Sequence, residues 1–417
     1  MSRVVIVGGG HSGVELAFSL RQLGYTGAIA VLEKSSFPPY ERPPMSKSWI
    51  SGTAGPDELA LRNQNAFAQS TIDLMLNCEV NSIDRKQQTV TTNDGVIEYS
   101  VLVLALGSSP RQLRITGSEL SGLHQFHTLE HALALRDDLA RASRIAVIGA
   151  GFIGLEFASA AAKLGKPVVI LETAARVMPR TASELTASYV RSRHEVSGTD
   201  FRFNASVLEI RGQAGRVKEI VLSDGTCVEA NLVVQGIGAN PNGEWTADLG
   251  LNFDNGIVVD TCLRTNDPNI YAIGDCARFV DEEGRSVRLE SIGNACDHAR
   301  RAAAAIANTP VPPIETPWFW SNQAGVRLQM AGRIDRVEDW LLTGSVETNA
   351  FSMLGWRNRK LVYGESVNCP GDHVVIRNLL ATDTVPTPEK LKPISGMGLK
   401  AGIKFLAQQQ AESGSVY

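Results

Sequence analysis

Two glycine-rich segments constrain the fold of this chain more than any other feature. Residues 8–13 read GGGHSG and residues 149–154 read GAGFIG, so both have the spacing G-x-G-x-x-G. Each follows a short apolar run, VVIV at 4–7 and RIAVI at 144–148, and precedes apolar residues at helical spacing. A further apolar run follows at 28–32 and at 167–171. This order of strand, glycine turn, helix and strand predicts a βαβ unit that binds a dinucleotide, and it occurs twice.

The glycines of such a unit have separate roles. The first permits a tight turn, the second lets the backbone approach a pyrophosphate, and the third lets helix and strand pack closely. The helix N-terminus supplies N–H groups and the positive end of the helix dipole for phosphates. The candidate residues are Gly8, Gly10 and Gly13 in the first motif, and Gly149, Gly151, Ile153 and Gly154 in the second.

An acidic residue ends the second strand of each unit, Glu33 in the first and Glu172 in the second. A carboxylate at this position accepts hydrogen bonds from free ribose hydroxyls and repels a 2′-phosphate. Arg176, shortly after Glu172, is a contrary feature, because its guanidinium could reach a 2′-phosphate. The sequence favours NADH over NADPH.

Two later segments indicate that the first dinucleotide is FAD. Residues 101–106 (VLVLAL) form a predicted strand followed by a loop through Arg111, and residues 270–273 form another followed by Gly274 and Asp275. Both resemble segments of flavoproteins of the glutathione-reductase superfamily, in which the acid after the late strand binds the ribityl chain of FAD. Asp275 matches that acid. In the second unit, the predicted strand 232–235 precedes small residues through Gly238, which would let a nicotinamide approach the flavin.

Composition excludes several other classes of protein. The chain has 417 residues, enough for two or three domains, and its net charge of −4 gives no reason to expect nucleic acid binding. No apolar stretch is long enough to cross a membrane, and the N-terminus lacks the features of a signal peptide, so we expect a cytoplasmic protein. The six cysteines have no C-x-x-C spacing and the seven histidines no metal-ligand spacing. We therefore expect no metal site, unreactive thiols, and histidines on the surface or supporting other residues.

Five segments carry a narrower resemblance. They are PPYERPPMSKSWI at 38–50, GAGFIGLE at 149–156, LESIGNACDHA at 289–299, PWFWSNQ at 317–323 and LQMAG at 328–332. As a set, they resemble the NADH-dependent ferredoxin reductases of bacterial oxygenase systems. This family includes the putidaredoxin, rubredoxin and biphenyl dioxygenase reductases. The resemblance implies an α/β protein with two Rossmann-like dinucleotide-binding domains, one for FAD and one for NAD, and a C-terminal α+β domain.

The resemblance also implies roles for individual residues. Arg42, Pro43 and Lys47 would lie beside FAD, with Lys47 close to the flavin ring. Glu156 would face Lys47 and the nicotinamide. Glu290 and Ser291 would lie near the flavin, while Trp318 and Trp320 would lie at the flavin edge where the electron acceptor docks. The chain departs from the family at Asn322, where Asp is usual, at Leu106, where Thr is usual, and at the variable position His11.

The predicted domains are residues 1–112 with 243–316 for FAD, 113–242 for NAD, and 317–417 for the C-terminal domain. The proline-rich residues 306–317 would link into the last domain. The tail beyond Pro386 carries no informative pattern. A monomer is the default expectation.

The resulting hypothesis is hydride transfer from NADH to FAD, and then electron transfer to a separate [2Fe–2S] ferredoxin or rubredoxin that serves an oxygenase such as a cytochrome P450 or a Rieske dioxygenase. The partner must carry the cluster, because this chain has no iron–sulfur cysteine set. Lys47 and Glu156 would form the catalytic pair, the alternative being a surface ion pair of little energetic value.

Three other functions stay open. The first is an NADH oxidase or quinone reductase of the same fold. The second is a flavin disulfide reductase or peroxidase. Such an enzyme would need a cysteine pair or a single reactive cysteine beside the flavin, yet residues 34–60 contain no cysteine and Cys276 has no partner by spacing. An NADH-sensing interaction protein, like the vertebrate apoptosis-inducing flavoprotein, is the third.

Overall fold

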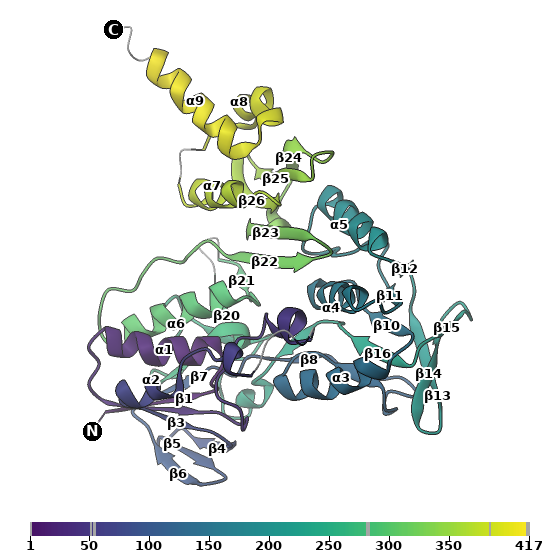
Figure 1. The fold of residues 1–417 in the computed structure, drawn as a ribbon. Helices are drawn as coiled ribbons and strands as arrows, with labels where there is room; N and C mark the ends of the chain where they lie inside the picture. The colour runs from purple at the N-terminus through teal and green to yellow at the C-terminus, as the bar shows by residue number, and fades with distance from the viewer. Residues whose placement is uncertain (1, 51, 53–55, 281–283, 383–384, 414–417) are drawn as a thin grey trace. The chain divides into compact units, whose positions relative to one another are not determined.

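The computed structural model describes residues 2–50, 52, 56–280, 284–382 and 385–413 (Figure 1). The chain divides into two units, each of which is described by itself. Unit 1 comprises residues 1–44, 52–111 and 239–315, and unit 2 comprises residues 45–51, 112–238 and 316–417. Both units are therefore assembled from segments that are distant in the sequence.

Unit 1 is built on a five-stranded parallel sheet of order β19-β7-β1-β2-β3. Its strands are Ile270–Ala272, Val101–Leu104, Arg3–Val7, Ala28–Leu32 and Ile72–Met75. The central strands are buried and rich in Val, Ile and Leu, as expected of a sheet covered on both faces. Helices α1 (His11–Gln22) and α6 (Ile292–Ile306) lie side by side against it (Figure 1).

Smaller elements complete unit 1. They are helix α2 (Gln64–Gln69), the antiparallel sheet of β4 (Val80–Asp84), β5 (Thr89–Thr92) and β6 (Gly95–Glu98), the pair β8 (Ser108–Pro110) and β17 (Ala239–Pro241), and the sheet of β18 (Ile257–Val259), β20 (Ala277–Val280) and β21 (Ser286–Val287). Short 3₁₀ helices cover Pro56–Leu59, Glu244–Ala247 and Gly274–Cys276.

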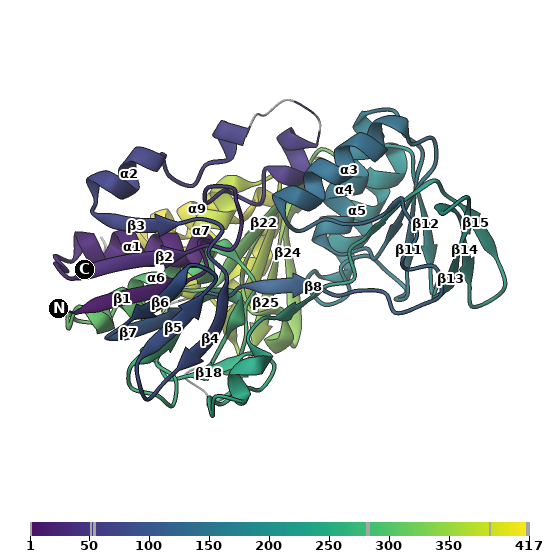
Figure 2. The same ribbon diagram turned by 90° about the horizontal axis from the view of Figure 1, so that it is seen from below.

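Unit 2 contains a second five-stranded parallel sheet, of order β12-β11-β10-β16-β9. Its strands are Thr199–Phe203, Val168–Glu172, Ile145–Ile148, Leu232–Gln235 and Leu123–Gln125. The helices of this part are α3 (Leu129–Arg141), α4 (Phe152–Lys163) and α5 (Glu184–Val196). A separate antiparallel ribbon of β13 (Val207–Gln213), β14 (Arg216–Leu222) and β15 (Cys227–Glu229) is visible at the right of Figure 2.

The C-terminal part of unit 2 is an antiparallel sheet of order β22-β23-β26-β25-β24 followed by helices. The strands are Trp318–Gln323, Val326–Gly332, Lys360–Val367, Ala350–Arg357 and Asp339–Ser345, with a 3₁₀ turn at Ile334–Arg336. Helix α7 (Pro370–Leu380) packs on this sheet. A π-helical turn, Met45–Trp49, also belongs to unit 2 and packs against α4.

The predicted fold class is confirmed, since two parallel-sheet units of Rossmann type and an α+β C-terminal part are present. The tail beyond Pro386, which carried no informative pattern, forms α8 (Pro388–Leu391), a 3₁₀ turn (Lys392–Met397) and α9 (Leu399–Ser413). Asp372 of α7 anchors α9, because its carboxylate accepts hydrogen bonds from the backbone N–H groups of Leu399 (3.2 Å) and Lys400 (2.8 Å). This anchor is a contact between a side chain of one helix and the backbone of another, so no repeat in the sequence predicts it.

Three histidines lie in the interior, and two of them hydrogen-bond to other groups there, His194 to Gln323 and His298 to the N–H of Gly274. His194, His298 and His373 are buried in the folded chain. Burial lowers the pKa of each of them, to about 3 for His298 and about 4 for His373. These imidazoles are therefore neutral at pH 7, and a neutral ring can occupy an interior position that a charged one could not.

Candidate dinucleotide sites

The first glycine motif forms the turn between β1 and α1 in unit 1. A Cβ at Gly8, whose φ is +109°, would lie 2.3 Å from the carbonyl oxygen of Ala105, and one at Gly13 would lie 2.0 Å from that of Gly8. Only glycine fits at either position. Gly10, by contrast, faces open space and caps α1 without any side-chain hydrogen bond. The N–H groups of the first helical turn therefore receive no hydrogen bond from a capping side chain, an arrangement suited to binding a phosphate.

The second motif repeats this geometry between β10 and α4 in unit 2. A Cβ at Gly149, with φ of +103°, would lie 2.5 Å from the carbonyl oxygen of Gly236, and one at Gly154 would lie 2.2 Å from that of Gly149. Gly151 faces open space and caps α4 with no side-chain hydrogen bond. The second copy therefore keeps each of the features that suit the first to a pyrophosphate.

The two strand-end acids are also placed alike. Glu33 Oε2 accepts a hydrogen bond from the N–H of Gly9 (2.7 Å), and its Oε1 accepts one from Ser35 (2.8 Å). Glu172 Oε2 accepts from the N–H of Ala150 (2.7 Å), and its Oε1 accepts from Ala174 (2.8 Å). In each unit a carboxylate beside the glycine turn is held by two backbone N–H groups, at the place where an adenosine ribose would bind.

Arg176, the residue whose guanidinium could favour NADPH, hydrogen-bonds within its own loop. Its guanidinium donates hydrogen bonds to the carbonyl oxygens of Ala182 (3.1 Å) and Pro179 (2.9 Å). These bonds would have to break before Arg176 could reach a 2′-phosphate. Two other residues were assigned to this site. Ile153 lies on the first turn of α4 and is 45% exposed, and Gly238, with φ of +98°, follows β16.

Several predicted FAD residues gather around Asp275 in unit 1. Asp275 lies in the 3₁₀ turn after β19, and Ser108 Oγ donates a hydrogen bond to its Oδ2 (3.0 Å). Burial and the nearby charge of Glu290 raise the pKa of Asp275, while Arg42 and Arg288 act in the opposite direction. Asp275, which the sequence assigned to the ribityl chain, is therefore influenced by both acidic and basic side chains.

Neighbouring residues complete this cluster. Glu290 Oε1 pairs with Arg288 Nη1 at 2.6 Å. Ser291 is the N-cap of α6, where its hydroxyl accepts a hydrogen bond from the N–H of Asn294 (3.2 Å). Burial and Arg42 lower the pKa of His11 to about 4, so His11 at the start of α1 is neutral at pH 7. Arg111 Nε donates a hydrogen bond to Asn240 Oδ1 (3.0 Å) on β17.

The predicted catalytic residue Glu156 lies on α4. Its carboxylate is buried, with 6% exposure, and both of its oxygens accept hydrogen bonds from serine hydroxyls. Ser46 donates to Oε2 (2.5 Å) and Ser321 donates to Oε1 (2.6 Å). Sequence reasoning missed both serines, because each lies far from Glu156 in the chain and neither has a distinctive pattern of its own.

Lys47 follows Ser46 in the π-helical turn Met45–Trp49, which packs against α4. Its backbone therefore lies in the same unit as Glu156. The Lys47 side chain lies outside the described residues, so the Lys47–Glu156 pair stays a hypothesis.

Trp318 and Trp320 stand on one face of the edge strand β22. Their rings stack at 5.2 Å with an interplanar angle of 25°, and the Arg377 guanidinium lies 5.0 Å from the Trp318 ring centre. Both side chains are half-buried. Phe319 and Ser321, on the opposite face of β22, contact α4.

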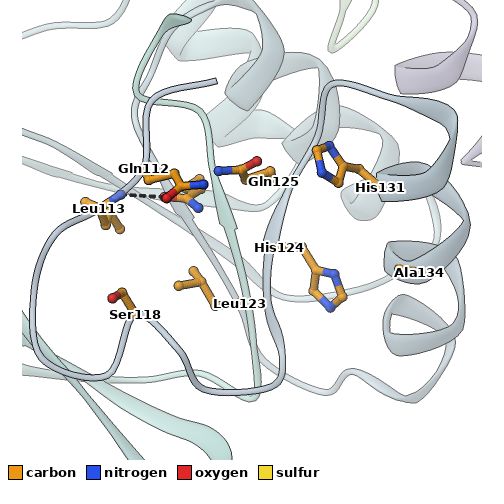
Figure 3. Close-up of a pocket in the computed structure, with 9 residues that line it drawn as sticks. Gln112, Leu113, Ser118, Leu123, His124, Gln125, His131 and Ala134 are labelled. Carbon is orange, nitrogen blue, oxygen red and sulfur yellow. Dashed lines mark hydrogen bonds between the residues drawn. The ribbon is translucent and has the colours of Figure 1, made fainter. Parts of the chain in front are cut away.

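A polar pocket of about 310 Å³ lies in unit 2 at the carboxyl ends of the neighbouring parallel strands β9 and β16 (Figure 3). Gln125 and Gln235 end those strands, and Gln235 accepts a hydrogen bond from the N–H of Leu113 (3.1 Å), the dashed line in Figure 3. His124 and His131 line the other side. None of the predicted dinucleotide residues lines this pocket.

Thiol and metal chemistry receive no support from the described residues. Cys276 is fully buried, and its Sγ donates to the carbonyl oxygens of Ile273 (3.3 Å) and Leu104 (3.4 Å). Burial raises its pKa to about 11, which leaves it a poor nucleophile. Among the residues that the structure covers, no group of three or more His, Cys, Asp or Glu could hold a metal ion. Within the same part of the chain, no helix is long and apolar enough to cross a membrane.

Comparison with known proteins agrees with this arrangement. Residues 2–299 match the pyridine nucleotide-disulphide oxidoreductase family, and residues 318–396 match the reductase C-terminal family. The chain therefore belongs to the pyridine nucleotide-disulphide oxidoreductases. Its relatives define the group more narrowly as the ferredoxin reductases, as the five quoted segments predicted.

Three of these relatives illustrate the similarity. Rhodocoxin reductase from Rhodococcus erythropolis is 40% identical over 93% of this chain and 91% of its own length. Rubredoxin-NAD(+) reductase from Pseudomonas putida is 38% identical over 88% of this chain and 96% of its own length. The crystal structure of a covalent complex of putidaredoxin reductase with putidaredoxin matches with a TM-score of 0.90 and 35% identity, covering 94% of this chain and 95% of that one.

Proposed function

We propose that the chain is an FAD-dependent NADH:ferredoxin oxidoreductase. It would pass electrons from NADH, through FAD, to a small iron–sulfur protein that serves an oxygenase such as a cytochrome P450 or a Rieske dioxygenase. The observation that carries the proposal is the duplicated site. Each unit has an open glycine at an uncapped helix N-terminus and a strand-end carboxylate held beside it. One chain is thus equipped for two dinucleotides.

FAD would bind in unit 1. Gly8, Gly10 and Gly13 would admit the pyrophosphate, and Glu33 would hold the adenosine ribose. Asp275 would accept from the ribityl chain, with Arg42, Arg111, Glu290 and Ser291 around the cofactor. Trp318 and Trp320 would lie at the flavin edge. The flavin, when bound, supplies the capacity to accept a hydride and to release electrons singly.

NADH would bind in unit 2. Gly149, Gly151, Ile153 and Gly154 would form the pyrophosphate site, Glu172 would hold the ribose, and Gly238 would leave room for the nicotinamide. The bonds between Arg176 and its own loop support NADH over NADPH, because they keep the guanidinium from a 2′-phosphate. Lys47 and Glu156 would position the nicotinamide ring and balance charge beside the flavin.

The partner would be a [2Fe–2S] ferredoxin or a rubredoxin, as the names of the relatives suggest. The domain boundaries would be 1–112 with 243–316, 113–242 and 317–417. The protein would act as a monomer in the cytoplasm, without nucleic acid or membrane partners.

Anaerobic titration of the purified protein with NADH, followed by addition of a [2Fe–2S] ferredoxin, tests the proposal. Visible spectra should show loss of the oxidised flavin bands and then catalytic reduction of the ferredoxin. Flavin reduction without transfer to ferredoxin or rubredoxin would favour the oxidase or quinone reductase alternative. A protein that binds no flavin would contradict the proposal at its centre.

A further inference from the structure

A continuous chain of buried hydrogen bonds runs through unit 2 and ends at Glu156. His194 Nε2 bonds to Gln323 Oε1 (2.9 Å), Gln323 Nε2 donates to Ser321 Oγ (2.9 Å), and Ser321 Oγ donates to Glu156 Oε1 (2.6 Å). Ser46 Oγ donates to the second carboxylate oxygen from the other side. All five side chains are buried. The residues of this hydrogen-bond network come from α5, β22 and α4, which are labelled in Figure 1, and from the Met45–Trp49 turn.

The direction of these bonds is uniform. The Gln323 carbonyl oxygen can only accept, so the neutral His194 ring donates to it. The Gln323 amide then donates to Ser321, whose own proton is directed to Glu156. Each donor therefore polarises the next toward the carboxylate, and charge-assisted bonds of this kind are stronger than neutral ones. The network holds the Glu156 side chain in one orientation.

The backbone on both sides of Glu156 is fixed by separate contacts. Phe152, Glu156 and Ser159 share one face of α4 and meet β22 in sequence order. Phe152 packs on Phe319 with ring centres 4.6 Å apart, and Ser159 Oγ accepts a hydrogen bond from the N–H of Ala324 (2.8 Å). Because α4 and β22 are held together at both ends, loss of the Ser321 hydroxyl should release the carboxylate without separating the two elements.

We propose that Ser46, Ser321 and Gln323 are positioning residues that fix the Glu156 carboxylate for the NADH half of the reaction. This inference rests on the proposed function. Ser46 also anchors the turn that carries Lys47 to α4, so the same network sets the backbone of the second member of the proposed pair.

A double-mutant cycle of Ser321→Ala with Glu156→Gln tests the inference. The two readouts are the rate of flavin reduction at saturating NADH and the NAD⁺ dissociation constant of the oxidised holoprotein, measured by calorimetry. Ser321→Ala should slow flavin reduction roughly tenfold, the effect of one charge-assisted hydrogen bond. It should raise the NAD⁺ dissociation constant by at least about threefold. In the Glu156→Gln background it should add little to either.

Ser159→Ala is the matched control, since it removes another buried serine bond, between α4 and the residue that follows β22, that does not touch Glu156. It should lower the thermal midpoint as much as Ser321→Ala does, yet leave the rate and the dissociation constant within about twofold of wild type. Ser46→Ala, which acts on the other carboxylate oxygen, replaces Ser321→Ala if that variant does not fold.

The outcomes separate the inference from the function on which it rests. If NADH reduces the wild-type flavin but Ser321→Ala behaves like Ser159→Ala, or its effects add fully to those of Glu156→Gln, the inference alone is overturned. If NADH does not reduce the wild-type flavin, the proposed function falls and the inference falls with it.

Discussion

At the scale of single residues, glycines of the same motif are required for different reasons. Neighbouring backbone oxygens leave no room for a side chain at Gly149 or Gly154. Gly151, by contrast, has open space where a Cβ would stand. The fold therefore depends on the first and third glycines, whereas the second has room for the proposed contact with a ligand. Sequence spacing identifies all three, but it does not distinguish these two kinds of requirement.

Gly151→Ala should weaken NAD⁺ binding while leaving the fold intact. Its extended backbone suits alanine, so the free energy of unfolding should fall by less than about 1 kcal/mol. The new methyl group would occupy the space of the pyrophosphate and raise the NAD⁺ dissociation constant by at least about tenfold. Calorimetry and urea unfolding measure the two quantities. Gly396→Ala, also at an open glycine but in the C-terminal part, should change neither.

The buried His298 should make the protein sensitive to acid. Its Nδ1 accepts a hydrogen bond from the N–H of Gly274 (3.2 Å), and its folded pKa of about 3 lies below the unfolded value of 6.5. The unfolded state therefore binds more protons between these values, and stability is lost as pH falls below about 6.5, by up to about 1.4 kcal/mol per pH unit. His298→Asn should keep the acceptor but show a shallower slope. Equal slopes in urea unfolding series at pH 4–7 would contradict this.

At the scale of elements, the two βαβ units were predictable because their signals are local. An apolar run, a glycine turn and a helical repeat lie within some thirty residues of each other, and their physical roles need no distant partner. The two serines that donate to Glu156 lie 110 and 165 residues from it in the chain. Long-range contacts of this kind leave no periodic trace in one sequence, so they emerge only from the fold.

Asp372→Ala should loosen the C-terminal helix α9 selectively. The carboxylate accepts from two backbone N–H groups of α9 and from Ser352 Oγ (2.9 Å), and it is buried. Its loss should cost about 2 kcal/mol of stability, as loss of a helix cap and a buried acceptor does. Hydrogen exchange should accelerate in residues 399–409. Removal of the exposed Asp339 on β24 gives the comparison, and equal exchange in both variants would argue against the anchor.

At the scale of the whole molecule, family membership and electron transfer without thiols fit together. The family name refers to disulphides, yet the chain's six cysteines are all unpaired, and Cys276 beside the proposed ribityl acid has a raised pKa. In the proposed reaction, the two dinucleotides supply the redox chemistry. Cysteine spacing in the sequence predicted no reactive thiol pair, whereas the burial of Cys276 could not be read from the sequence.

Alkylation of accessible thiols should therefore leave the protein active. After treatment with N-ethylmaleimide, NADH-driven flavin reduction and ferredoxin reduction should stay within about twofold of the untreated rates, because a buried thiol of high pKa is unreactive. Cys276→Ser should behave similarly. Complete loss of NADH-driven reduction in the serine variant, with its flavin still bound, would restore the disulfide reductase or peroxidase alternative.

The hydrogen-bond chain from His194 to Glu156 has a consequence for proton movement. Its second member, Gln323, is an amide, which can pass a proton along only through an unfavourable imidic acid form. The network is continuous, but it does not provide a favourable path for proton transfer between the imidazole and the carboxylate. The donors of this network orient Glu156 but do not deliver protons to it. Any proton that Glu156 gains or loses must therefore travel by another path.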